Sequence, residues 1–129
     1  MFGNIDVFRI AQSLSTHATA RQNVVARNMA NADTPGYAAR RVVSFQSFLN
    51  GSQSAADGPH SSRHKHLNSV VGNGPQVLID QSQSPDPNGN TVSLEGEMLR
   101  AVDIKHDHDR ALAIYKSSLD LLRISLGRR

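Results

Sequence analysis

LEGEMLRAVDIKHDHDRALAIYKSSLDLLRISL, residues 94–126, is the stretch that decides the fold of this chain. Its side chains follow alternating steps of four and three residues, the a and d positions of a heptad repeat. Eight of the ten positions in this series are apolar, and the series runs without a slip for almost five heptads. This pattern predicts a coiled-coil helix over residues 92–127, with Asn90, Thr91 or Ser93 as its N-cap. The apolar members of the predicted seam are Leu94, Met98, Ala101, Leu112, Tyr115, Leu119, Leu122 and Leu126, and Lys105 and His108 take the other two positions.

A second apolar stripe follows the end of the same helix. Ile114 and Leu121 fall at heptad position c and Ile124 falls at f, so all three point away from the a/d seam. One partner helix covers only one face, and a helix that is apolar on two faces is normally buried on both. We therefore predict that other subunits cover Ile114, Leu121 and Ile124. A frayed end with scattered exposed apolar residues is the alternative.

The partner for the first face is a helix predicted over residues 4–32. Its seam contains Val7, Ala11, Leu14, Ala18, Val25 and Ala32, with Arg21 and Asn28 on the same stripe. At about 1.5 Å per residue, this helix is roughly 40 Å long. It ends before Thr34-Pro35-Gly36, because proline cannot continue a helix. The fold class is mainly α: a single domain, residues 1–129, with two long terminal helices packed as an antiparallel-type coiled coil.

The middle of the chain is polar and rich in loops. Residues 33–49 are expected to be a turn and an extended segment, with a short helical turn over Phe45–Leu49. Residues 50–90 hold only eight apolar residues among 41, too few to offset the entropy of ordering them. Within this flexible loop, Val77–Ile79 is predicted to pair with Val42-Val43 as a short β-hairpin, and the run Pro85–Gly89 has turn chemistry.

Composition excludes several classes of function. The 129 residues include no cysteine, so disulfides, thiol catalysis and Cys-ligated metals are absent. The net charge is +3 and aromatic residues make up 5%, without the basic stripe and interleaved rings of nucleic-acid binders. No phosphate loop, nucleophile elbow or paired-carboxylate motif is present, so the sequence predicts no enzyme and no cofactor. The sequence also predicts neither a Sec signal peptide nor a membrane span.

Histidines suggest one metal-site hypothesis. His60, His64 and His66 lie close together in the polar middle, and such a group can bind zinc or nickel. A solvated polar loop is the alternative, because neither carboxylate nor cysteine accompanies them. The run 106–109 points in different directions around its helix and cannot converge on one ion. We therefore predict no metal ligand, and His108 is interpreted as a polar seam residue that sets register.

The most specific motif is NMANADTPGY, residues 28–37. It closely resembles the signature that follows a long N-terminal helix in bacterial flagellar rod and hook proteins, and it contributes Asn28, Ala30, Asn31, Thr34, Pro35, Gly36 and Tyr37. The two asparagines can bond the helix end and the turn, Gly36 permits a positive φ, and Tyr37 can pack back through its ring and hydroxyl. Residues 88–95 and 109–116 resemble the end of short rod proteins, so the likeness covers about two thirds of the chain.

The resemblance implies a structural subunit of the proximal rod in the basal body, which crosses the periplasm. Such subunits self-assemble into a hollow helical rod that transmits torque and conducts exported subunits. The implied partners are other copies of the chain, rod proteins of the FlgC, FlgF and FlgG types, the rod-base adaptor FliE and the flagellar type III export apparatus. Phe45 and Leu49 fit the Phe-x-x-x-aliphatic export signal of early substrates, and packing against the helices is the alternative role.

Other functions stay open at this stage. A FlgC-type rod sibling is similar in size and carries a related motif. A soluble helical hairpin acting as an export chaperone or adaptor is another possibility, and it would form a discrete small oligomer in the cytoplasm. The third and weakest is a metal-binding protein built on the histidine loop at residues 60–66.

Overall fold

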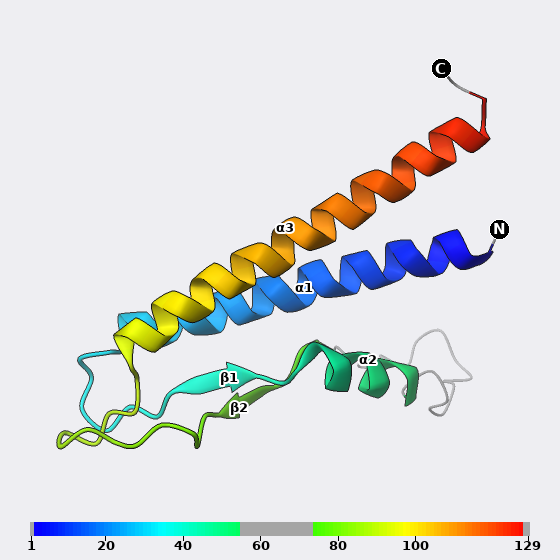
Figure 1. Ribbon diagram of the computed structural model, residues 1–129. Helices are drawn as coiled ribbons and strands as arrows, with labels where there is room; N and C mark the ends of the chain where they lie inside the picture. Colours follow the sequence, from blue (N-terminus) through cyan, green and yellow to red (C-terminus); the bar gives the residue numbers. More distant parts are fainter. Residues whose placement is uncertain (1, 55–73, 128–129) are drawn as a thin grey trace, which may run out of the picture.

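Two long antiparallel helices dominate the molecule. The computed structural model describes residues 2–54 and 74–127, with helix α1 at Phe2–Ala30 and helix α3 at Leu94–Ser125. They lie side by side, with the N- and C-termini at the same end (Figure 1). Both bounds are close to the predicted ranges, and Ser93 is the N-cap, since its hydroxyl accepts a hydrogen bond from the amide of Gly96. The predicted mainly α fold is confirmed.

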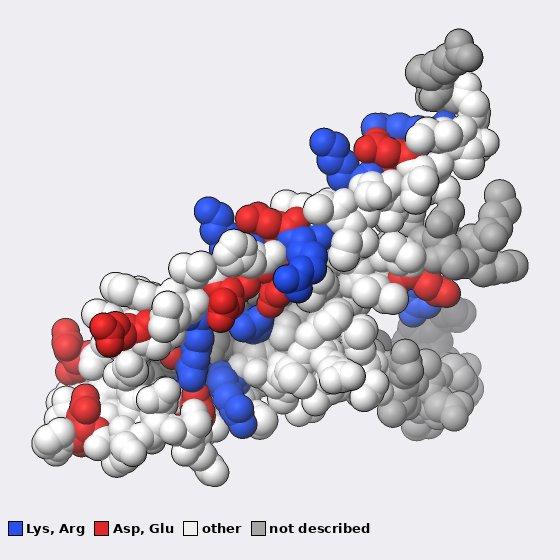
Figure 2. Space-filling view, viewed as in Figure 1, with Lys and Arg blue, Asp and Glu red and all other residues white. Residues whose placement is uncertain are grey.

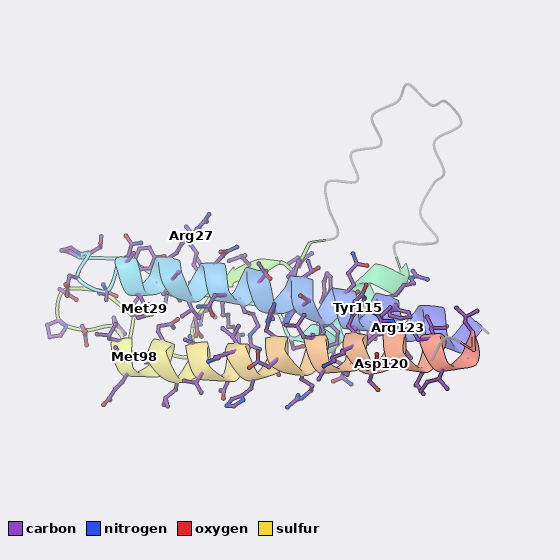
Figure 3. All side chains as sticks on the ribbon, turned by 90° about the horizontal axis from the view of Figure 1, so that it is seen from above. Arg27, Met29, Met98, Tyr115, Asp120 and Arg123 are labelled. Atoms are coloured by element: carbon purple, nitrogen blue, oxygen red, sulfur yellow. The ribbon has the colours of Figure 1, made fainter. Side chains whose placement is uncertain are left out.

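The core between α1 and α3 is narrow and built from small or branched side chains. Ala18 and Val25 of α1 enclose Ile104 of α3, and Met29 and Ala101 pack against this cluster. Figure 3 places Met29 at the same end of the helix pair as Met98, whereas Tyr115 lies toward the other end. Four predicted positions of the α1 seam are buried, namely Ala11, Ala18, Val25 and Asn28, whereas the predicted member Val7 is exposed.

The predicted seam of α3 is wrong for the contact with α1. Most of its residues are about half exposed or more: Leu94, Met98, Leu112, Tyr115 and Leu126. The buried face of α3 consists instead of Glu97, Ile104, Ala111 and Ser118, which repeat every seven residues at heptad position g. Ala101 borders that face, and Leu119 and Leu122 are half-buried. The contact face is thus rotated by roughly 70° from the a/d seam, at 3.6 residues per turn.

A small β layer lies below the pair of long helices in Figure 1, and Asp80, directly after its second strand, bonds Arg100 of α3. Strand β1, Arg40–Val42, pairs antiparallel with strand β2, Val77–Ile79, so that Val42 faces Val77. The predicted pairing is confirmed, although a long connection joins the strands in place of a tight hairpin turn. Helix α2, Phe45–Ser54, replaces the predicted short helical turn.

His17 fixes this layer to α1. Its Nε2 donates a hydrogen bond of 2.7 Å to the carbonyl oxygen of Val43. Its ring lies 5.5 Å from that of Phe45 and 5.9 Å from that of Phe48, centroid to centroid. His17 is buried, and the sequence did not predict this role because its partners come from a different element. Helix α1 therefore packs against α3 and, through His17, against the segment that joins β1 to α2.

Some predictions concern residues without a described position. His60, His64 and His66 lie outside the described residues, so the metal hypothesis for that loop stays a prediction. Within residues 2–54 and 74–127, no group of three His, Asp or Glu side chains is placed to hold a metal ion. None of the helices in those ranges has the length and hydropathy that crossing a membrane requires.

Candidate functional site

The signature segment forms a turn that reverses the chain at the end of α1. The helix ends at Ala30, earlier than Pro35 requires, and the amide of Asn31 bonds back to the carbonyl oxygens of Arg27 and Asn28. Gly36 then adopts φ of +72°, the left-handed conformation that favours glycine. This agrees with the conformation predicted for Gly36. The tip of the turn is exposed, so the contacts that hold its backbone must come from α1 and from other segments packed against its base.

Asn28 supplies part of that fixation from within α1. Its side chain is fully buried, with Nδ2 donating to the carbonyl oxygen of Arg40 at 2.7 Å and Oδ1 accepting from the Arg40 amide at 3.0 Å. The amide side chain thereby imitates a strand partner for β1. The Tyr37 hydroxyl also reaches Oδ1, at 3.4 Å. The polar position in the α1 seam is therefore the anchor of the β layer.

Asn31 and Thr34 stabilise the turn itself. Asn31 Nδ2 donates at 2.7 Å to the carbonyl oxygen of Arg27, which also accepts from the Asn31 backbone amide. The Thr34 hydroxyl donates to Asn31 Oδ1 at 3.3 Å. Ala30 is exposed, and its methyl side chain has no hydrogen-bonding group. Asn31 therefore bonds the helix end as predicted, whereas Asn28 bonds the backbone of Arg40 and the Tyr37 hydroxyl instead of the helix end.

A second segment, residues 86–92, clasps the turn from the C-terminal half of the chain. Asn90 is only 1% exposed, and its Nδ2 lies 2.7–2.9 Å from the carbonyl oxygens of Asn31, Ala32 and Thr34. Its Oδ1 accepts from the amide of Val92 at 2.7 Å. This single side chain joins the turn after α1 to the segment that leads into α3. From the sequence, Asn90 was predicted only as a candidate cap of the second long helix.

Backbone contacts complete the clasp. The Gly36 amide donates to the carbonyl oxygen of Asn88 at 3.0 Å, and the Thr91 amide donates to that of Tyr37 at 3.1 Å. Gly89 has φ of +78°, and a Cβ placed on it would lie 3.4 Å from the Gly36 Cα. The two glycines therefore allow the two turns to approach closely. The turn predicted at 85–89 is confirmed, since the Gly89 amide bonds to the carbonyl oxygen of Asp86.

A buried ion-pair group fixes the start of α3 to the end of β2. Arg100 donates to Asp80 at 2.8 Å and to Glu97 at 2.7 Å, and both carboxylates are almost fully buried. Burial raises the pKa of Asp80, but hydrogen bonds from Ser82 and the nearby Arg100 guanidinium outweigh it and leave the pKa below its ordinary value. Glu97 and Arg100 lie one turn apart on α3, whereas Asp80 reaches them from the residue after β2.

The arrangement described so far is one of structural anchoring. Turn, clasp and ion pairs consist of hydrogen bonds that connect elements distant in the sequence. Charged side chains are interleaved along the face seen in Figure 2, without a continuous basic stripe. Along α3, Arg110 pairs with Asp107 at 3.4 Å and Arg123 pairs with Asp120 at 3.3 Å. Asp107 also bonds Arg21 of α1 at 2.7 Å, which locks the two helices in register.

Comparison with known proteins identifies the signature. The family model described as "Flagella basal body rod protein" matches residues 8–37, most of α1 and the whole turn. The chain is similar to flagellar basal-body rod proteins. Flagellar basal body rod protein FlgB of Agrobacterium fabrum (strain C58 / ATCC 33970) is 27% identical over 96% of this chain and 95% of the relative. The resemblance expected from residues 28–37 is confirmed, and both comparisons support a structural role in the rod and a place in the basal body.

Proposed function

We propose that this rod-type chain is a structural subunit of the proximal rod, with no catalytic role. The observation that carries the proposal is the likeness to FlgB along nearly the whole chain. A likeness confined to the signature would fit any axial protein that carries it. The size of this chain, two long helices and one small β layer, leaves no separate outer domain between the helices within the described residues.

Self-assembly is supported by apolar side chains that the hairpin itself leaves exposed. Leu121 is 58% exposed and Ile124 is 74% exposed, on a side of α3 that α1 does not reach. Ile114, the third predicted interface residue, is half-buried. The stripe lies in the last turns of α3, toward the C-terminus. Neighbouring subunits that cover it would gain apolar burial in every repeat of a helical rod.

The clasp formed by residues 86–92 suits a subunit that transmits torque. A rod subunit must resist twisting between its inner helices and its outer layer. The Asn28 and Asn90 hydrogen bonds and the Arg100 ion pairs connect α1, α3 and both strands near the signature turn. Each is buried or partly buried, where hydrogen bonds to charged or amide groups are most costly to break. The proposed hollow rod thus consists of subunits whose layers are tied together.

Export through the flagellar type III apparatus, without a Sec signal, is part of the same proposal. Phe45 and Leu49 are its candidate signal. Phe45 contacts the His17 ring in the folded chain, and Leu49 is half-buried. A receptor could read both only before α2 has docked on α1. FliE and rod proteins of the FlgC, FlgF and FlgG types are the proposed neighbours after export.

Imaging of isolated basal bodies tests the proposal. A small tag inserted at residue 60, in the segment between α2 and β2, should appear as extra density around the proximal rod, next to its base. A FlgC-type subunit would place the density at a different height in the rod. Recovery of the tagged chain only as a discrete cytoplasmic oligomer bound to another protein would contradict the proposal and favour the chaperone alternative.

A further inference from the structure

The two-stranded sheet has two edges, and α1 closes one of them. On the outer side of β1, the backbone amide and the carbonyl oxygen of Arg40 both bond the Asn28 side chain. Strand β1 packs on α1, and it lies between β2 and the long helices in Figure 1. The sheet can therefore be extended only along β2.

The register of the two strands leaves a row of backbone groups open along β2. The Val43 amide donates to the carbonyl oxygen of Gln76 at 3.0 Å. Hydrogen-bonded pairs alternate in an antiparallel ladder, so the next residue of β2 that bonds β1 is Leu78. The amide and carbonyl groups of Val77 and Ile79 therefore point away from β1, and they bond no other group within residues 2–54 and 74–127.

The side chains of β2 are apolar on both faces of the sheet. Val77, Leu78 and Ile79 are each about half exposed or more. Proteins protect a free sheet edge with a charged residue, a proline or a bulge in the edge strand, and β2 contains none of these three. A strand added beside β2 would complete the backbone ladder and would also cover apolar side chains on both faces.

Two arginines of β1 favour an acidic strand at this edge. The register places Arg40 beside Ile79 on one face of the sheet and Arg41 beside Leu78 on the other. Both arginines are exposed; Arg40 has no ion pair with the described residues, and the Arg41 pair with Asp80 is long, at 4.0 Å. Neighbouring strands lie about 4.8 Å apart, so a third strand would lie about 10 Å from β1. An arginine and a glutamate can span that distance together.

We infer that the outer edge of β2 binds an extended segment of another protein, in which apolar residues alternate with aspartate or glutamate. The segment adds a third strand to the sheet through the outward groups of Val77 and Ile79. A second copy of this chain is a poorer match, because pairing β2 with β2 would bring two sets of arginines to one sheet with no acid in any strand. That pairing would also be twofold and closed. The contact leaves both long helices free and does not depend on a place in the rod.

Peptide binding to the full-length chain tests this contact. The probe is a fluorescein-labelled peptide of about eight residues in which valine and glutamate alternate. In fluorescence anisotropy it should bind about tenfold more tightly than the same peptide with lysine in place of glutamate. A glutamate peptide with a central proline, which cannot form the ladder, is the charge-matched control and should also bind about tenfold more weakly. Arg40→Glu should weaken binding of the glutamate peptide, whereas the matched charge reversal Lys116→Glu, exposed on α3, should not.

Backbone measurements locate the bound peptide. Hydrogen exchange at the Val77 and Ile79 amides should slow when the glutamate peptide is added, while the Leu78 amide, already bonded to β1, should change little. Val77→Pro removes an outward N–H group without removing a bond to β1, and it should abolish binding. If circular dichroism shows that this variant has lost helix, Val77→Lys replaces it, because a charge on the edge should cause the same loss.

Four results would overturn the inference. Equal binding of the glutamate and lysine peptides would remove the role of the arginines. Unchanged exchange at Val77 and Ile79 would place the peptide elsewhere. Slow exchange at both amides in the chain alone would show an edge that is already covered. Dimers in sedimentation that Val77→Pro abolishes would make a second copy the occupant.

Discussion

Replacing Asn90 with alanine should uncouple the signature turn from the segment that enters α3. The substitution removes two N–H donors shared among three carbonyl oxygens, and the acceptor for the Val92 amide. That amounts to three hydrogen-bond equivalents at a site that is 1% exposed. At about 1 kcal/mol for each, the expected loss is about 3 kcal/mol, a large part of the stability of a small domain.

The measurement is urea unfolding of the purified full-length chain, followed by the helical circular dichroism signal. Asn88→Ala is the matched control, because its exposed side chain accepts one hydrogen bond, from the Asn90 amide. That control should lose no more than about 1 kcal/mol. Asn90→Asp should be at least as damaging as the alanine variant, since its carboxylate would face three carbonyl oxygens. An Asn90→Ala loss equal to that of the control would refute the argument that the clasp stabilises the fold.

Four further results are expected. The lowered pKa of Asp80 means that its contribution is complete above the ordinary carboxyl pKa of about 3.9 and is lost as pH falls through the folded value; acid titration of Asp80→Asn should show a correspondingly shallower loss of stability. Ile104→Ala should cost about 2–5 kcal/mol by chemical denaturation, because it empties the centre of the core. The Leu121→Asp variant should be exported but left out of rods, whereas Asp120→Ser should have only a small effect, as measured by motility and basal-body composition. Normal rods with Leu121→Asp would remove the argument that neighbouring subunits cover Leu121 and Ile124. Phe45→Ala should lower secretion while cytoplasmic protein persists, whereas normal secretion with failed assembly would favour the packing role.

The sequence predicted both long helices, the strand pairing and the signature turn, since each depends on local pattern. On α1, the predicted seam positions Ala11, Ala18, Val25 and Asn28 are buried, but Val7 is exposed. On α3, however, the heptad pattern identified an apolar stripe but not the partner that covers it. Glu97 looked like a solvent-facing charge, yet it is buried because Arg100 neutralises it from the next turn and reaches on to Asp80. A carboxylate and a serine at g positions gave no apolar signal for the contact with α1.

The clasp was beyond prediction for a different reason. Asn90 and its carbonyl partners are separated by 56–59 residues, and no periodicity relates them. A run rich in asparagine and glycine predicts a turn, but it does not reveal which other turn it meets. One polar residue in the sequence did point to such a contact. Asn28 interrupts the apolar seam of α1, and a buried side-chain amide needs a hydrogen-bond partner. His17 is the same kind of signal on the neighbouring stripe.

The antiparallel arrangement of α1 and α3 affects the order in which the chain can fold. Arg21 and Asp107 are 86 positions apart, and the Ile104 side chain that completes the core comes equally late. Contacts this distant require closure of a long loop before they return any stability, which slows folding. During synthesis, α1 emerges long before the helix that buries its apolar stripe. We therefore expect the growing chain to lack its packed helix pair until most of α3 has been synthesised. In that unpacked form, the chain is narrow enough to pass end first through a narrow channel.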